Sequence, residues 1–326
     1  MKKVLFATTA LIATAGVAAA EVKFSGYGRF GIGYIEDRST NDNVSDTALV
    51  SRFRLNIDGI TETDGGVRFE GRVRLQADDD ASTGEAGSAG LNGARFSVIF
   101  GGLRVDAGNV AGAFDNLANY YGNEPGLENF IGQYSGVDYE FLAYSSTGSG
   151  ANAVFFQYAV GDFAFGASYD QNTTNNGNTA LGGADQWDIS ATYTFNNITA
   201  ALAYGQTDGP AGADDPSLVV LTLGAEFGDF SGTLFVGRDS DTPLNDAGEE
   251  TDGTNYGISA AYNVGSALTL TAAYGDGSAD GDTQQYGIGA IYDLGGGASL
   301  RGGIGRSKVG SADGTTRADF GAQFNF

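Results

Sequence analysis

Residues 51–76 read SRFRLNIDGITETDGGVRFEGRVRLQ, and the spacing of their apolar side chains decides the fold. Phe53, Leu55 and Ile57 alternate with polar or charged residues, and Val73 and Leu75 do the same further along. Successive residues of a β-strand point to opposite sides, so this alternation gives each strand one apolar and one strongly polar face. The stretch therefore predicts two neighbouring strands, at 48–60 and 66–78.

The same period of two continues through most of the chain. It predicts sixteen strands, at 22–36, 48–60, 66–78, 91–100, 103–108, 151–159, 163–170, 185–195, 198–206, 217–227, 230–239, 254–263, 266–275, 283–293, 298–307 and 315–326. Short connections such as Gly101-Gly102 alternate with long polar ones such as 172–184. The uncharged stretch 254–275 is long enough for a membrane helix, but the turn-like Asn263-Val264-Gly265-Ser266 inside it favours a hairpin.

Two features separate this pattern from a soluble β-sandwich. The polar face is charged even at strand centres, and the segments run about ten residues, the length of a tilted membrane strand. In the first three strands every charge falls on the polar face, whereas a charge facing lipid costs roughly 2–4 kcal/mol at mid-bilayer. Outer-membrane barrels also alternate short periplasmic turns with long outer loops. We therefore predict an all-β fold, a 16-stranded antiparallel transmembrane β-barrel.

Residues 109–150 form one exceptional connection, and a loop of this size inside a compact domain needs a reason. Sixteen strands enclose a channel wide enough for water, which a loop folded into the lumen would narrow. Phe114, Leu117 and Tyr121 have helical spacing and allow a short helix. Asp138 to Tyr144 (DYEFLAY) could be another strand, but counting it would break the alternation of connections. We expect the loop to fold inward; a disordered outer loop is the alternative.

The first twenty residues have the features of a cleaved secretory signal. Lys2 and Lys3 precede an apolar run that is too short to span a bilayer, and Ala18-Ala19-Ala20 supplies a small-residue cleavage site. A retained anchor is the alternative. We expect one barrel domain at 21–326, whose fifteen Lys and Arg against 40 Asp and Glu give a net charge of −25. That charge argues against nucleic-acid binding and attracts cations.

The residue inventory restricts the chemistry. The chain has no Cys and no His, which excludes thiol and imidazole catalysis and His-ligated metal sites. The G-x-G-x-x-G match at 26–31 lies inside an alternating strand, without the helix that a dinucleotide site needs. Asp276, Ser278 and Asp280 start like a calcium loop, but Gly287 stands where a bidentate acid is required. A weaker calcium site built from loop carboxylates stays open, and no cofactor is required.

Charged residues are concentrated in two sets. The alternation points a basic set into the lumen: Arg29, Arg52, Arg54, Arg68, Arg72 and Arg74. The long loop carries an acidic set: Asp115, Glu124, Glu128, Asp138 and Glu140. If the loop crosses the channel, acids face arginines across water, and the transverse field sorts solutes by charge and dipole. The alternative is that these groups are simply solvated.

Several segments resemble the general porins of purple bacteria and related alphaproteobacteria, the Rhodobacter and Paracoccus type. They are SGYGRFGIGYIEDR at 25–38, residues 51–76, DAGNVAGAFDN at 106–116, YDLGGGAS at 292–299 and ADFGAQFNF at 318–326. The resemblance covers most of the chain after residue 20 and is weaker from about 120 to 280. The last segment is also an alternating strand ending in Phe, which would close the barrel against the first strand.

The resemblance implies a trimeric diffusion channel with its third outer loop folded inward. It places Arg29, Arg52, Arg54, Arg72 and Arg74 on the basic side of a narrow eyelet and Asp115 on the loop side. It also implies calcium bound near the eyelet and a homotrimer. The other loop acids lie in the part of the chain that matches less well, so the resemblance assigns them no role.

The leading hypothesis is an outer-membrane pore for passive diffusion of small hydrophilic solutes and ions, weakly cation-selective because of the acidic charge. It would contact outer-membrane lipid and lipopolysaccharide. A substrate-selective porin, for example for sugars stacked on Tyr120, Tyr121 and Tyr134, is the alternative. A structural or adhesive barrel is a weaker one. A barrel phospholipase or protease needs a nucleophile–base pair that this sequence lacks, so we expect no enzyme activity.

Overall fold

The computed structural model describes residues 20–38, 45–80, 85–173, 184–209, 214–244, 249–279 and 281–326. The predicted signal segment, except for Ala20, and Asp280 of the calcium-like motif lie outside these ranges. In the part of the chain that the structure describes, no helix is long and apolar enough to cross a membrane.

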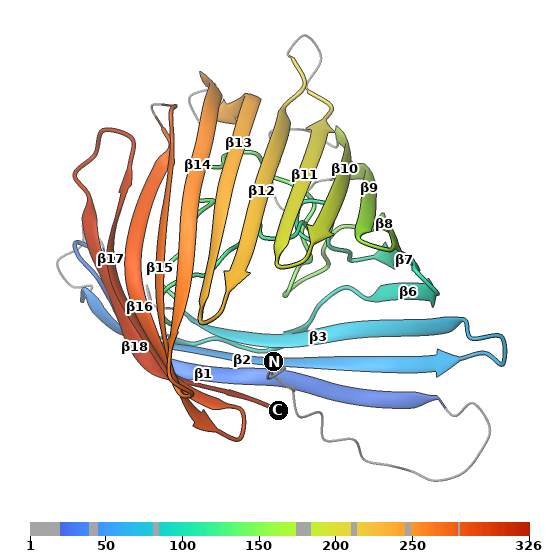
Figure 1. Cartoon of the computed structure of the whole chain (residues 1–326), viewed down its shortest axis with the longest axis horizontal. Coiled ribbons are helices and arrows are strands. Elements are labelled where there is room, and N and C mark those ends of the chain that lie inside the picture. Colours follow the sequence, from blue (N-terminus) through green and yellow to red (C-terminus); the bar gives the residue numbers. More distant parts are fainter. Residues whose placement is uncertain are drawn as a thin grey trace.

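Strands account for nearly all regular structure. They are β1 (Glu21–Ile35), β2 (Thr47–Glu62), β3 (Arg68–Asp80), β4 (Glu85–Ala86), β5 (Gly90–Leu91), β6 (Arg95–Phe100), β7 (Leu103–Gly108), β8 (Ala153–Val160), β9 (Phe163–Thr173), β10 (Ala184–Phe195), β11 (Ile198–Thr207), β12 (Ser217–Phe227), β13 (Phe230–Leu244), β14 (Glu249–Val264), β15 (Leu268–Gly277), β16 (Thr283–Gly295), β17 (Ala298–Val309) and β18 (Thr315–Asn325). The two-residue strands β4 and β5 pair with β3, and the other sixteen form the barrel (Figure 1). The predicted sixteen-stranded antiparallel barrel is confirmed.

The barrel closes by pairing its first and last strands. β1 pairs with β2 on one side and with β18 on the other, in an antiparallel register that sets Phe30 opposite Ala322. Beyond the register, Gly26 and Phe326 exchange two backbone hydrogen bonds, of 2.8 and 3.0 Å. Closure gives β1 and β18 a partner on both sides, so neither presents a free edge of N–H and C=O groups to lipid.

Compared with a soluble protein, the barrel has its apolar side chains on the outside and its polar side chains on the inside. In β12, Leu221 is 53% exposed on the outer surface, while its neighbour Thr222 is fully buried inside the barrel. The same alternation exposes large apolar residues on the outside of the other barrel strands and turns Asp, Asn, Gln and Ser inward. An apolar outer band with a polar interior is the pattern that lipid outside and water inside impose on a barrel.

The two ends of the barrel differ in their connections. One end, called the short-turn end, holds the connections 63–67, 101–102, 161–162, 196–197, 228–229, 265–267 and 296–297. The opposite end, called the long-loop end, holds the others, including 36–46, 109–152 and 310–314. In outer-membrane barrels the short turns face the periplasm and the long loops face outward, and the two ends of this barrel show the same asymmetry.

One part of the barrel wall is built from short strands. β6 and β7 have six residues each and β8 has eight, and we call these three strands the short wall. A strand that crosses the bilayer at the usual tilt needs about 9–11 residues. The short wall is therefore too short to face the full apolar thickness of a membrane.

The connection between β7 and β8 turns back into the barrel, as predicted. Figure 1 shows its teal-to-green trace running behind β11 to β15. Phe114, Leu117 and Tyr120 pack in one buried cluster with Leu218 and Val220 on the inner face of β12. Burying these apolar groups against the wall stabilises the inward position of the loop.

The short helix allowed by the spacing of Phe114, Leu117 and Tyr121 does not form, and that interpretation is wrong. The segment makes isolated turns, with single hydrogen bonds such as Asn116 N–H to the Gly112 carbonyl. The Asn116 side chain donates to that same carbonyl at 2.9 Å, and Asn119 adopts a left-handed conformation with φ of 62°. Both features end a helix before a second turn is complete.

The outward face of β12 offers a direct test of the membrane orientation. Leu221→Arg puts a charge at mid-strand on the outer surface. It should lower the free energy of unfolding in lipid by roughly 2–4 kcal/mol. Phe227→Arg, at the short-turn end of the same strand, should cost roughly 0–1 kcal/mol because it lies near the interface. Urea titration of refolding into vesicles measures both. Equal costs would contradict a lipid-facing outer surface.

Candidate functional site

Five arginines meet on the inner faces of the first three strands. Arg29 lies directly opposite Arg52 in the β1–β2 register, and Arg54, Arg72 and Arg74 continue the group along β2 and β3. We call these five residues the arginine wall. Neighbouring strands place alternate inward positions side by side, which is why a pattern of period two brings the five guanidinium groups together.

Acids and amides of the same strands are interleaved with the arginine wall. Arg72 forms an ion pair with both carboxylate oxygens of Asp58, and Arg52 pairs with Asp78. The Arg74 Nε atom donates to Asn56 at 2.8 Å. Part of the positive charge is thus compensated within the wall itself, which holds the guanidinium groups in fixed orientations.

Arg68 is the predicted basic residue that the structure separates from the others. It is the first residue of β3, at the short-turn end, where it is 43% exposed and pairs with Glu70. Sequence reasoning also missed inward arginines near the wall. Arg95, Arg301 and Arg317 lie at inward positions of β6, β17 and β18. The alternation within those strands carried the signal, and barrel closure brings β17 and β18 next to β1.

The tip of the long loop is held by one inward carboxylate of β18. The backbone N–H groups of Leu127, Glu128 and Asn129 donate to Asp319, each at 2.8 Å. The wall beneath the tip is made of glycine: a Cβ added at Gly321 would lie 2.7 Å from the Leu127 side chain. Charge-assisted bonds and close packing together fix the tip against β18 and β1.

Fixing the tip brings Glu128 to the arginine wall. Its carboxylate lies 3.0 Å from Arg29 Nη2 and 3.9 Å from Arg52 Nη2. Arg29 also donates to the Leu127 carbonyl at 3.0 Å. Burial raises the pKa of Glu128 more than Arg29 and Arg52 lower it. Among the five predicted acids, Glu128 is the one that reaches the basic residues directly.

A second arm of the loop touches the wall near the start of β8. The Ser146 hydroxyl accepts hydrogen bonds from Arg74 at 2.6 Å and from Arg54 at 3.2 Å. The Arg74 guanidinium lies 4.5 Å from the centre of the Tyr144 ring. These neutral contacts orient two of the arginines without removing their charge.

Two further acids occupy the loop surface with tyrosines between them. Tyr121 donates to Asp115, and Tyr134 donates to Glu124 at 2.9 Å, while the two rings pack edge to face at 5.2 Å. Loss of surrounding water raises the pKa of Glu124, against a lowering by the Tyr134 hydroxyl and by the charge of Arg29. Glu124 thus lies within the electrostatic reach of the arginine wall, as the prediction of opposed charges requires.

The structure does not bring Asp138 and Glu140 to the arginines. The Asp138 N–H donates to Asp239 of β13 at 3.2 Å, and the Glu140 carbonyl accepts from Gln186 of β10. Burial, helped by the neighbouring Asp138 carboxyl and opposed by the Ala279 N–H, raises the pKa of Asp282 to about 7. The pore-lining roles of the predicted acids and arginines stay predictions. In the structure, Asp115, Glu124 and Glu128 lie apart from Asp138 and Glu140.

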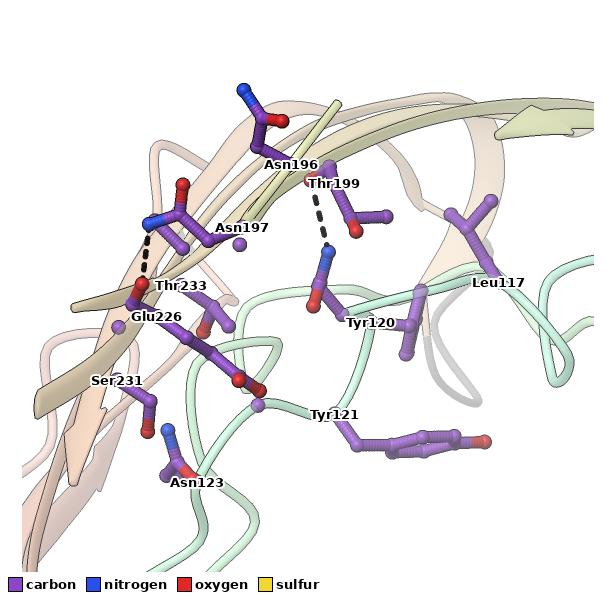
Figure 2. Close-up of a pocket in the computed structure, with 15 residues that line it drawn as sticks. Leu117, Tyr120, Tyr121, Asn123, Asn196, Asn197, Thr199, Glu226, Ser231 and Thr233 are labelled. Atoms are coloured by element: carbon purple, nitrogen blue, oxygen red, sulfur yellow. Dashed lines mark hydrogen bonds between the residues drawn. The ribbon is translucent and has the colours of Figure 1, made fainter. Parts of the chain in front are cut away.

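A polar cavity lies inside the barrel under the loop, at the short-turn end. It has a volume of about 490 Å³ and is lined by loop residues 117 and 119–123, by the turn at 196–197 and by β11 to β13 near their turns. Figure 2 shows the side chains of Asn123, Glu226 and Ser231 directed into one space. Asn119 bridges loop and wall by donating to the Thr199 carbonyl at 3.1 Å. The cavity can offer several hydrogen-bond partners to a hydrated solute.

The sequence leaves open a weak calcium site built from loop carboxylates. Within the ranges that the structure describes, no group of three or more acidic residues is arranged to hold a metal ion. Asp276 of the calcium-like motif accepts hydrogen bonds from Tyr274 at 2.7 Å and from Gln284.

Comparisons with known proteins agree on one family. A family model described as Gram-negative porin matches residues 7–312. A porin of Fuscovulum blasticum is 34% identical over 314 residues, and one of Rhodobacter capsulatus is 30% identical over 329 residues. Each alignment covers 94% of this chain and all of the relative.

Solved structures show the same likeness. The chain resembles an engineered variant of the porin of Rh. blastica with a TM-score of 0.74 and 30% sequence identity. The match covers 94% of this chain and 100% of that one. The barrel and the inward loop therefore belong to a fold that an experimental structure already contains.

The three-way contact at Asp319 predicts a local effect on the loop. Asp319→Asn replaces one acceptor oxygen by a donor, so at least one of the three N–H groups loses its partner. The loss of charge-assisted bonding should cost roughly 1.5–3 kcal/mol of local stability. Amide hydrogen exchange at residues 127–129 should then accelerate by about tenfold or more.

The matched control is Asp293→Asn, which alters a carboxylate that binds only the Gly295 N–H near a turn. It should leave exchange at 127–129 unchanged. Unaltered exchange in the Asp319 variant would mean that packing alone holds the tip.

Proposed function

Because the chain belongs to the Gram-negative porin family, we propose that it forms a water-filled channel for passive diffusion of small hydrophilic solutes and ions. A β-barrel of this family lies in the outer membrane, which it crosses many times. The relatives are named porins, which are channels and not enzymes. We propose the same absence of catalysis here, consistent with a sequence that lacks Cys and His.

The observation that carries the proposal is the charge arrangement at the loop. The arginine wall stands on β1 to β3, and the loop core packs on β11 to β13, so the loop spans the lumen between them. Asp115, Glu124 and Glu128 lie on the loop. Fixed opposite charges across a narrow aqueous path order water and favour small polar solutes over apolar ones.

We propose a weak cation preference for the open channel. Residues 21–326 carry 40 acids against fifteen basic groups, and Asp58 and Asp78 compensate part of the arginine wall. The remaining guanidinium groups repel cations at the narrowest part. The two effects oppose each other, which keeps the preference small.

A homotrimer is supported by the short wall. Six-residue strands cannot cover the apolar thickness of the membrane by themselves. Packing of this wall against other copies of the chain would shield it from lipid, and a ring of three closed by heterologous contacts does so for every copy.

Single-channel recording in planar lipid bilayers tests the pore and its eyelet together. Wild-type protein should give ohmic steps that close in thirds, with a small reversal potential of cation-selective sign under a salt gradient. The double variant Arg52→Gln, Arg54→Gln should become more cation-selective. An ion about 7 Å from a unit charge in water feels about 0.6 kcal/mol, so losing two such charges should raise the cation permeability by about two- to sevenfold and lower the anion permeability similarly. Their ratio should therefore rise by more than either permeability changes.

The control is Arg68→Gln, Arg104→Gln, which removes the same charge from side chains next to the short turns 63–67 and 101–102, away from the loop tip. Its permeability ratio should stay close to that of the wild type. Absence of conductance from folded wild-type protein would favour the structural or adhesive barrel. An unchanged ratio in the first double variant would remove Arg52 and Arg54 from the constriction.

The cavity under the loop favours a second candidate, a solute-selective porin. Its polar lining and the nearby Tyr121 ring combine hydrogen-bond partners with an aromatic surface, as sugar sites do (Figure 2). A selective channel binds its solute long enough to interrupt ion flow, whereas a general pore does not.

Sucrose-dependent block of the single-channel current separates the two candidates. If the cavity binds sugar, Asn123→Ala should weaken the block by about two- to tenfold, the effect of one hydrogen bond. Asn152→Ala, an exposed change outside the cavity, should have no effect. Current without any sugar-dependent interruption would leave the general pore as the function.

A further inference from the structure

The outer surface of the barrel carries a hollow between β14 and β17, near the long-loop end. Its volume is about 700 Å³, and its outward-facing lining includes Ile258, Ala260, Ala272, Tyr286, Ile288 and Ile304. Four of these side chains are between 45% and 64% exposed: Ile258, Tyr286, Ile288 and Ile304. The hollow therefore opens to the surroundings of the barrel.

The hollow follows from side-chain size along one row of the sheet. Ala260 pairs with Ala272, Ala272 with Ile288, and Ile288 with Ile304. Directly paired residues share one face of the sheet, so two short side chains stand beside two long ones. The alanines leave a depression about as wide as two strands, bounded by isoleucine and tyrosine.

Two basic side chains lie at the edge of this hollow that is nearer the long-loop end. Arg306 lines it, and Lys308 follows two residues later on the same face of β17, closer to the long-loop end. Among the residues that the structure places, neither has an acid within ion-pair distance. Two acids act on these cations at longer range, Glu36 on Arg306 and Asp276 on Lys308. Their carboxylates accept hydrogen bonds from neutral groups: Glu36 from the Thr316 N–H at 2.7 Å, and Asp276 from Tyr274 and Gln284.

The level of these cations in the membrane is marked by tyrosines. Tyr274 and Tyr286 are paired on the outer face, in the same row as Arg306. Tyrosine rings gather where the apolar band of a barrel meets the polar headgroups. The long-loop end faces outward, so the cations lie at the headgroup level of the outer leaflet, with the hollow below them at acyl-chain depth.

The hollow also lies away from the short wall. Among the sixteen barrel strands in order, β7 is the fifth and β15 the thirteenth, which puts them half a turn of the barrel apart. If the short wall forms the contacts between copies, this face meets lipid.

We propose that the hollow binds a phosphorylated glycolipid of the outer leaflet, with one acyl chain over Ala260 and Ala272 and a phosphate on Arg306 and Lys308. The proposal rests on the outer-membrane orientation in the proposed function. Guanidinium and ammonium groups with no described acid within ion-pair distance suit a phosphate, and an apolar depression beneath them suits a saturated chain. The same chemistry makes a zwitterionic phospholipid a weaker occupant.

The test is titration of purified diphosphoryl lipid A onto the protein refolded in neutral detergent, followed by native mass spectrometry. Arg306→Gln, Lys308→Gln should weaken binding by about five- to thirtyfold, since each basic group at a membrane surface contributes about fivefold. Ala272→Phe fills the hollow without changing charge and should also weaken binding. Phosphatidylcholine should bind the wild type less tightly than lipid A does.

Arg238→Gln is the matched control, because this outward cation of β13 already has Asp252 at 4.0 Å. It should keep wild-type lipid A affinity. Single-channel conductance of every variant should equal that of the wild type, which separates failure of the lipid site from failure of the pore. Equal lipid A affinity in all proteins would overturn the proposal. A change of oligomeric state in Ala272→Phe would overturn it too, by making the hollow a contact between copies.

Discussion

The interior of this barrel depends on carboxylates that accept backbone N–H groups from the long loop. A chain segment that leaves the sheet loses its ladder partners, and its N–H groups need acceptors. Asp319 supplies them to residues 127–129, and Asp239 supplies them to Asp138 and Tyr139. Without these inward acids the apolar cluster on β12 would still attract the loop, but nothing would set its depth. The position of Glu128 opposite Arg29 follows from that depth.

The arginines of the lumen are partly neutralised by acids in contact with them. Asp58, Asp78 and Glu128 each contact an arginine, from two strands and from the loop respectively. In a narrow aqueous space such pairing keeps guanidinium groups oriented while leaving part of their charge to act on passing ions. The tyrosines of the loop hold two more acids in place beside them. Rigidity and a moderate field therefore come from the same contacts.

The alternation of side chains was enough to predict the strands, their closure and the inward direction of the arginines. It is a local property, and the register of neighbouring strands follows from it. The path of the loop is not local: Leu127 meets Asp319 across 192 residues of sequence. For this reason the sequence alone could not show that Glu128 reaches the arginines, whereas Asp138 contacts Asp239 of β13. The helical spacing of Phe114, Leu117 and Tyr121 reflected a packed cluster and not a helix.

Closure of the barrel has a consequence for how the chain could be connected. Because β18 pairs with β1 as hairpin partners do, the first and last strands have no special place in the sheet. β1 begins and β18 ends at the short-turn end. A chain whose ends are joined there and which is opened in a long loop would contain the same sixteen neighbours in the same order. The fold thus tolerates circular permutation by its geometry, and its order of strands is a ring with no first member.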